Sequence, residues 1–278
     1  MTSSRLRIGL IGMGAIGSRV ARSLQERPQQ VEWVAALVQA PERHACRSHE
    51  GVPLITDRLD EFLSTRPDLV VECAGHSAVA RHARTVLLAG SDLLLVSAGA
   101  LADDTLLQEL QQAAAVSSRH LFVASGAIGG IDWLRAARRA GPLKVLYRSR
   151  KPPLAWRGSE AESLLNLADV AEATVFFRGT AREAAKRFPR NANVAATIAL
   201  ATGGLDATEV ELCADPGTTD NLHEIEAVGA SGRLLLALRN SPDPDNPRTS
   251  AITAYSAIDA ILDPGTGITL SQAAPASA

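Results

Sequence analysis

The sequence has few cysteines, almost no net charge and no long apolar run. Its three cysteines, Cys46, Cys73 and Cys213, are widely spaced among 278 residues and form no C-x-x-C pair. This pattern predicts neither a disulfide framework nor a metal site, so we expect reduced thiols without a chemical role. The formal net charge is -2, with acidic and basic residues interspersed. Such a balance excludes the electrostatic footprint of a protein that binds nucleic acid or a membrane surface.

The length and hydropathy set further bounds. No segment is apolar over the length that spans a bilayer, and the first residues lead into a predicted strand rather than into a signal sequence. We therefore expect a cytoplasmic protein. A hydrophobic content of 46% is enough for a sizeable core in one or two domains.

What the sequence does contain is a glycine turn between an apolar strand, residues 5–11, and a helix, residues 15–26. The turn has the pattern G-x-G-x-x-G and consists of Gly12, Met13, Gly14, Ala15, Ile16 and Gly17. In a dinucleotide site the first glycine permits the sharp turn, the second admits the pyrophosphate and the third lets the helix pack closely. A second apolar strand, residues 31–38, completes the βαβ unit. The alternative is a glycine turn that serves packing alone.

Apolar strands and helices continue to alternate up to residue 124. The strands are expected at 68–73, 92–97 and 120–124, with helices at 77–89 and 103–115 between them. This alternation predicts an α/β fold with a Rossmann-type, doubly wound parallel sheet. Ligands of such sheets bind at the carboxyl ends of the strands. There the segments 73–76, with Cys73 and Ala74, and 97–100 could line a nicotinamide site or could simply turn the chain.

The second half has a different pattern, which predicts a separate α+β domain. We expect a dinucleotide-binding domain over residues 1–125, an α+β domain over 126–249, and a C-terminal segment, 250–270, whose helix returns to the first domain. Strands are expected at 144–150, 174–178, 209–214, 222–230 and 233–239, and helices at 133–140, 183–187, 194–201 and 250–262. The last two strands resemble a hairpin around Ser231 and Gly232. Residues 272–278 are expected to be a frayed tail.

Several polar residues of the second half could carry chemistry. His223 lies in a predicted strand and is either an acid/base group or a strand histidine with local partners. Asn193 could cap the following helix or bind a carboxamide. Thr249 and Ser250 follow a cation, which suits a carboxylate ligand but is also ordinary at the start of a helix.

Two further features leave alternatives open. Arg148, Arg150 and Lys151 form either a basic edge near a binding cleft or a strand edge protected by charge. His76 follows a strand end and either faces a cofactor or caps the next helix.

Together these residues resemble the L-aspartate dehydrogenase family. The similar segments run nearly end to end: 12–17, 125–130, 150–153, 179–185, 188–197, 214–216, 221–225 and 246–250. The resemblance implies that His223 is the acid/base residue and that Ala127 and Asn193 contact the nicotinamide dinucleotide. It also implies a homodimer built through a catalytic and dimerisation domain, and a part in NAD synthesis from aspartate.

The implied reaction is the reversible oxidative deamination of L-aspartate to iminoaspartate, and then to oxaloacetate and ammonia. A hydride leaves Cα, and each later step moves a proton, for which a histidine of near-neutral pKa is suited. The two substrate carboxylates need partners as well. The turn amides of residues 125–130 and nearby arginine or lysine side chains are possible donors, and the sequence does not choose among them.

Gln39 stands where NAD-specific folds commonly place an acidic residue against the ribose diol. Because no carboxylate repels a 2′-phosphate there, and because Arg43 follows closely, we expect the chain to use both NAD and NADP.

Two other functions compete with this interpretation. One is a related two-domain dehydrogenase of the homoserine dehydrogenase or dihydrodipicolinate reductase kind, against which the absence of their lysine-centred sites argues. The other is a dinucleotide-sensing protein without catalysis, which the presence of Asn193 and His223 disfavours.

Overall fold

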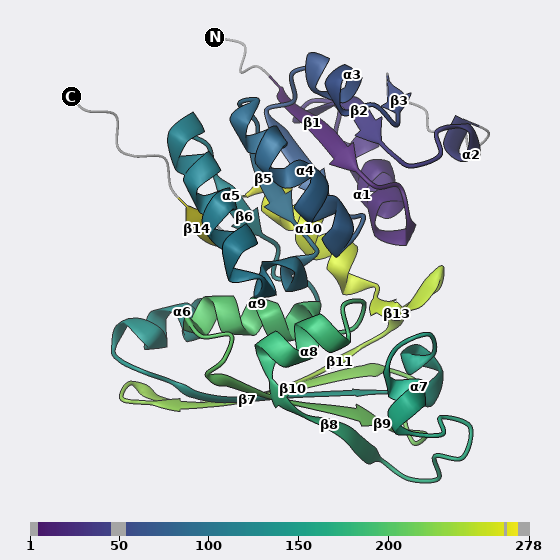
Figure 1. The fold of residues 1–278 in the computed structure, drawn as a ribbon, viewed down its shortest axis with the longest axis vertical. Coiled ribbons are helices and arrows are strands. Elements are labelled where there is room, and N and C mark those ends of the chain that lie inside the picture. The colour runs from purple at the N-terminus through teal and green to yellow at the C-terminus, as the bar shows by residue number, and fades with distance from the viewer. Residues whose placement is uncertain (1–4, 46–53, 264–265, 272–278) are drawn as a thin grey trace. The chain divides into compact units, whose positions relative to one another are not determined.

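The computed structural model describes residues 5–45, 54–263 and 266–271. Cys46 and the expected tail at 272–278 lie outside these ranges. The chain divides into two compact units. Unit 1 comprises Met1–Ala124 and Ala254–Ala278, and unit 2 comprises Ser125–Thr253. Each unit has its own sheet (Figure 1), so we describe the units separately.

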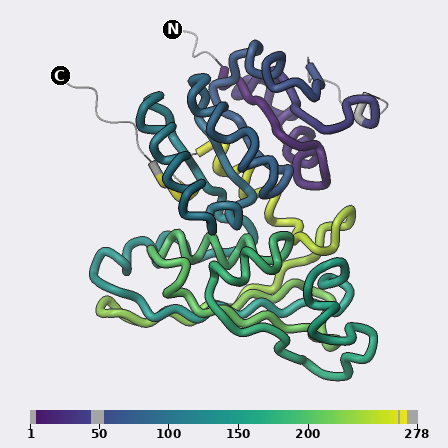
Figure 2. Tube along the Cα trace, viewed as in Figure 1, coloured from purple at the N-terminus to yellow at the C-terminus, as the bar shows by residue number. Residues whose placement is uncertain are grey.

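The sheet of unit 1 is parallel except at one edge. Its order is β14-β6-β5-β4-β1-β2-β3. The strands are β1 Leu6–Ile11, β2 Val31–Leu37, β3 Ile55–Thr56, β4 Leu69–Glu72, β5 Asp92–Leu95, β6 Leu121–Val123 and β14 Ile268–Ser271. Only β14 is antiparallel to its neighbour, which is β6. Figure 2 shows β14 near the yellow end of the chain. With β1 between β2 and β4, this is the order of a dinucleotide-binding sheet, and the predicted α/β fold is confirmed.

Helices cover the sheet of unit 1. They are α1 Ala15–Gln25, α2 Glu42–Ala45, α3 Leu59–Ser64, α4 His76–Leu88, α5 Asp104–Ser117 and α10 Ile252–Leu262, with a short 3₁₀ helix, η1, at Ala98–Ala102. One buried cluster joins Ile8 and Leu10 of β1 to Leu24 of α1 and Ala257 of α10. The residues of α10 from Ala254 onward therefore pack into the core of unit 1.

Unit 2 is built on a mixed sheet of order β11-β10-β7-β9-β8. Its strands are β7 Lys144–Lys151, β8 Thr174–Thr180, β9 Thr208–Ala214, β10 Asn221–Gly229 and β11 Gly232–Asn240. Helices α6 Ile131–Arg139, α8 Ala181–Arg187 and α9 Asn193–Thr202 cover one face (Figure 1). Strand β7 alternates buried and half-exposed residues, because successive side chains point to opposite faces. Strands β10 and β11 form the hairpin that the sequence predicts.

The sequence pattern does not predict the shortest helices and strands. Besides α2, β3, α3, η1 and β14, these are α7 Ala161–Leu164, the 3₁₀ helix η2 at Pro153–Trp156, and the strand pair β12 Pro242–Asp243 and β13 Asn246–Ser250. Segments this short show no periodicity that could predict them. The two strands β12 and β13 pair as a small hairpin, and α10 begins at Ile252 rather than at residue 250. No helix in the described ranges has the length and apolarity to cross a membrane.

Candidate active site

The glycine turn of unit 1 has two positions that admit no side chain. Gly12 has a φ of +92°, and a Cβ there would lie 2.8 Å from the Cβ of Ala74. Its amide donates to the carbonyl of Leu37 at 2.9 Å, which ties the turn to the end of β2. A Cβ on Gly17 would lie 2.1 Å from the carbonyl oxygen of Gly12. Glycine at these two positions is therefore required by the turn and by the close approach of α1.

Gly14 is different, because a Cβ built there meets no atom within 4 Å. Its φ of -74° and ψ of -162° are open to any residue, and it precedes α1 without a side-chain cap. Met13 is buried, whereas Ala15 and Ile16 are half-buried. Space beside the uncapped amides of a helix is what a pyrophosphate needs. The turn thus fits a dinucleotide, and glycine at position 14 has no packing reason within the protein.

Glu72, which the sequence does not mark as a site residue, ends β4 and organises the neighbouring strand ends. Its carboxylate accepts hydrogen bonds from the amides of Ala74 and Gly75, both at 2.7 Å, and from the amide and hydroxyl of Ser97 at 3.1 and 3.0 Å. Burial raises the pKa of Glu72 despite these bonds. In the sequence, the sign of this role is a single carboxylate at the end of an otherwise apolar strand.

The Glu72 carboxylate thus links the two segments expected to line the cofactor. The first is open, since Ala74 is exposed and Cys73 half-buried. Burial raises the pKa of the Cys73 thiol well above its ordinary value, so this thiol is not a nucleophile at neutral pH. The second segment, from Ser97 to Ala100, is buried and forms the start of η1, whose N-cap is Ser97.

Gln39 is exposed and stands two residues beyond the end of β2. Since β2 pairs with β1 and Leu37 bonds to Gly12, Gln39 lies at the same edge of the sheet as the glycine turn. Arg43 follows in α2 and is also exposed. His76, which follows the end of β4 in the chain, is the first residue of α4.

In unit 2, His223 lies on β10 with 2% of its surface exposed. Its Nδ1 is 2.7 Å from the hydroxyl of Tyr147 on the neighbouring β7, and the two rings are nearly parallel, at 10°. Its Nε2 is buried and has no hydrogen-bond partner. Tyr147 fixes the ring through one nitrogen and leaves the other available. Tyr147 belongs to no motif in the sequence, although the alternation of residues 144–150 places it on one face of a strand.

The charge environment of His223 differs from the expectation of a near-neutral pKa. Burial first, and the nearby Lys151 second, lower the pKa of His223 from 6.5 to about 3. Burial also lowers the pKa of Lys151 to about 8. The imidazole is therefore neutral and Lys151 remains mostly charged at pH 7.

This shift makes folding stability depend on pH. Between pH 6.5 and pH 3 the unfolded chain binds a proton at His223 that the folded chain does not bind, so stability falls as the pH is lowered through this window. We expect this residue to account for a loss of about 1–2 kcal/mol at pH 5. Urea unfolding of the wild type and of His223→Gln at pH 7 and pH 5 measures it. Equal losses in both proteins would contradict the buried, neutral histidine.

The other residues implied by the resemblance also lie in unit 2. Ala127 is buried in the loop before α6, and its carbonyl accepts a hydrogen bond from the Asn240 side chain at 2.8 Å. Asn193 is the first residue of α9, whose N-cap is Ala192, so of the two roles left open for Asn193 the capping role is wrong. The carboxamide role remains a proposal.

The basic residues of β7 differ in their partners and in the face of the strand on which they lie. Arg148 pairs with Glu211 at 2.8 Å and Arg150 lies 3.7 Å from Asp215. These arginines alternate with the buried face on which Lys151 lies. Ser250, expected to bind a carboxylate or to start a helix, instead ends β13 and accepts a hydrogen bond from Asn221 at 3.2 Å.

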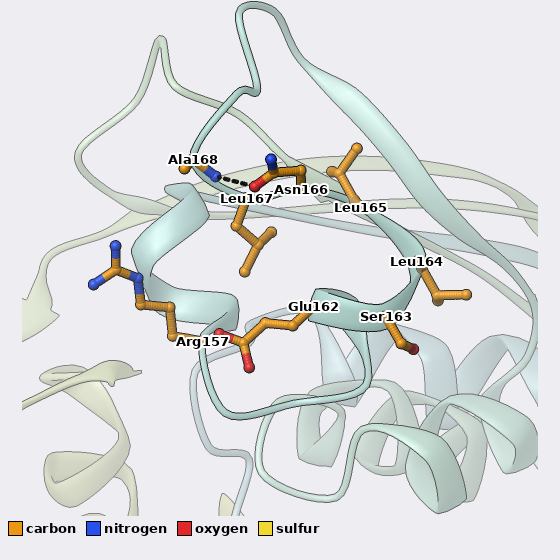
Figure 3. A pocket seen from close by; sticks show the side chains of 8 residues that line it. All are labelled: Arg157, Glu162, Ser163, Leu164, Leu165, Asn166, Leu167 and Ala168. Atoms are coloured by element: carbon orange, nitrogen blue, oxygen red, sulfur yellow. Dashed lines mark hydrogen bonds between the residues drawn. The ribbon is translucent and has the colours of Figure 1, made fainter.

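Unit 2 also has a cavity of about 640 Å³ that is unrelated to these residues. Figure 3 shows its lining, formed by Arg157, Glu162 and residues 163–168. Asn166 accepts a hydrogen bond from the amide of Ala168 at 3.3 Å within it. No residue of the proposed site lines this cavity. In the described ranges, no group of three His, Cys, Asp or Glu side chains is arranged to hold a metal ion.

The predicted residues therefore form two groups. Unit 1 brings the glycine turn, Gln39, Cys73 and Ala74 to the carboxyl edge of its sheet. Unit 2 holds Ala127, Asn193 and His223. Beside His223 the structure also places Tyr147 and Lys151.

Comparison with family models supports this division. Residues 12–124 match the NAD-binding domain of homoserine dehydrogenase, and residues 132–263 match the C-terminal domain of aspartate dehydrogenase. Unit 1 is thus an NAD-binding domain. The homoserine dehydrogenase match lies within unit 1.

Comparisons over the whole chain agree. The chain is 47% identical to the L-aspartate dehydrogenase of Ruegeria pomeroyi, covering 95% of this chain and 94% of that one. It is 43% identical to the enzyme of Cupriavidus necator, covering 92% and 96%. The crystal structure of aspartate dehydrogenase from Thermotoga maritima superposes with a TM-score of 0.70 at 27% identity, over 92% of this chain and 95% of that one. The chain belongs to the L-aspartate dehydrogenase family.

Proposed function

We propose that this protein catalyses the reversible, NAD(P)-dependent oxidative deamination of L-aspartate, with His223 as its acid/base residue. One observation carries the proposal. The buried Nε2 of His223 has no partner, while Nδ1 is held by Tyr147. A buried polar atom without a partner is costly in a structural histidine but useful in one that exchanges a proton with a ligand.

The dinucleotide would be held by the glycine turn, and when bound it supplies the acceptor for the hydride that leaves Cα of aspartate. In the tautomer protonated on Nδ1, the imidazole donates to the Tyr147 oxygen and the Nε2 lone pair accepts a proton. Burial raises the pKa of Tyr147 far above neutral, so its hydroxyl stays protonated. His223 can then take the proton of the substrate ammonium group and return it to the departing ammonia.

With a pKa of about 3, His223 acts as an acid/base group near neutral pH only if the bound substrate raises its pKa. A neutral imidazole is the form that accepts a proton. The negative charge of substrate carboxylates nearby would raise the pKa of His223 toward the working pH, where an acid/base group is most effective.

The direct test is an assay in both directions. NAD reduction with L-aspartate, and NADH oxidation with oxaloacetate and ammonia, should each proceed. A sensor protein without catalysis would bind NADH and give neither rate.

Cofactor choice should depend on Gln39. Gln39→Asp or Gln39→Glu should shift preference toward NAD, because a carboxylate accepts hydrogen bonds from the ribose hydroxyls and repels a 2′-phosphate. We expect the NAD to NADP ratio of kcat/KM to rise on the order of tenfold. Measuring both cofactors with wild type and variants decides the matter. An unaltered ratio would place the adenosine ribose away from Gln39.

The assembly and pathway are part of the same proposal. The family resemblance implies a homodimer whose product feeds NAD synthesis. A second subunit would cover Leu235 and Val228, which are 65% and 43% exposed on β11 and β10 of unit 2. Sedimentation equilibrium of the wild type tests the dimer, and a monomer at micromolar concentration would contradict it.

A further inference from the structure

Lys151 is the last residue of β7 and has only 4% of its surface exposed. Its Nζ donates to the carbonyl oxygen of Arg248 at 3.2 Å and lies 5.6 Å from the centre of the Trp156 ring. Within the part of the chain that the structure describes, no carboxylate is within ion-pair distance of it. A buried ammonium group without an anion is unfavourable unless a ligand supplies the charge.

The other two basic residues of this strand end do not share this property. Arg148 and Arg150 each have a carboxylate partner and lie on the opposite face. Lys151 is the member of the basic edge that is both buried and without a countercharge.

Atoms around Lys151 also lack partners. Ser149 lies two residues before it on the same face of β7, and Asn221 and His223 lie on the adjacent β10. The Ser149 Oγ, the Asn221 Oδ1 and the His223 Nε2 are all buried and have no hydrogen-bond partner. Three such atoms beside one uncompensated cation are unusual in a region that only packs. A cation together with hydrogen-bond acceptors is the complement of a carboxylate and an ammonium group.

We propose that Lys151 binds a carboxylate of the amino-acid substrate, while Asn221 and His223 face its ammonium group. This inference rests on the proposed function and names the cation that binds the substrate. The bound carboxylate supplies the countercharge that Lys151 lacks within the protein. It also offsets the positive charge that Lys151 presents to His223.

Lys151→Met tests the proposal, because methionine keeps most of the length and removes the charge. The matched control is Lys144→Met on the exposed first residue of the same strand. Succinate, a dicarboxylate without the reacting amine, is titrated calorimetrically into each protein saturated with NADH, and propionate serves as the monocarboxylate comparison. NADH affinity and the thermal midpoint are measured in parallel.

We expect Lys151→Met to weaken succinate binding at least tenfold and to lower kcat/KM for L-aspartate by 10²-fold or more, mainly through KM. NADH affinity should stay within twofold, and the thermal midpoint should not fall, since an unpaired buried charge is removed. Lys144→Met should match the wild type throughout. Unchanged succinate affinity in Lys151→Met would overturn the proposal. So would a lowered thermal midpoint with a parallel loss of NADH binding, which is the result for a purely structural lysine.

The binding experiment separates this inference from the proposed function. If the wild type fails to oxidise aspartate but binds succinate through Lys151, the proposed reaction is wrong and the carboxylate site stands. If it oxidises aspartate and Lys151→Met does so equally well, the reaction stands and the carboxylate site is wrong.

Discussion

His223→Ala should lower kcat for L-aspartate oxidation by about 10²-fold or more while leaving NADH affinity nearly unchanged. The imidazole handles protons, whereas the glycine turn that would hold the dinucleotide belongs to a different unit of the chain. Steady-state rates and NADH fluorescence titration measure the two effects separately. Circular dichroism establishes that the variant is folded.

A second substitution separates proton transfer from positioning. Tyr147→Phe keeps the ring beside His223 but removes the hydroxyl that holds Nδ1. Its kcat should fall less than that of His223→Ala, because Nε2 is retained. If folded His223→Ala kept more than half of the wild-type kcat, His223 would not be the acid/base residue.

Gly14→Val should abolish detectable NADH binding without unfolding the chain. The space beside Gly14 is open, and its backbone angles accept a branched residue. The valine side chain would then occupy the volume that the pyrophosphate needs. Fluorescence titration with NADH should show no saturable binding, and the thermal midpoint should stay close to that of the wild type.

Gly17→Ala is the matched control within the same turn. Its Cβ would collide with the carbonyl of Gly12 at 2.1 Å, so this smaller substitution should lower the thermal midpoint. The two variants should therefore differ in kind: Gly14→Val loses NADH binding, whereas Gly17→Ala loses thermal stability. Wild-type NADH affinity in Gly14→Val would mean that the glycine turn serves only packing.

The sequence determined the elements whose signals are local. The alternation of apolar strands and helices predicted the parallel sheet of unit 1, and the hairpin of β10 and β11 followed from its turn. The spacing of Gly12, Gly14 and Gly17 predicted the geometry of the turn, because backbone conformation and close approach depend on residues a few positions apart. Short strands such as β14 were missed, since pairing with β6 rather than local pattern defines them.

Only the tertiary structure decided which polar residues act together. Glu72 and Ser97 are 25 positions apart, and Tyr147 and His223 are 76 positions apart, yet each pair is within hydrogen-bond distance. Sequence alone could not sort Lys151 from Arg148 and Arg150, because that requires knowing which face of the sheet is covered. Nor could it find the lowered pKa of His223, since desolvation by burial depends on every element packed around the ring.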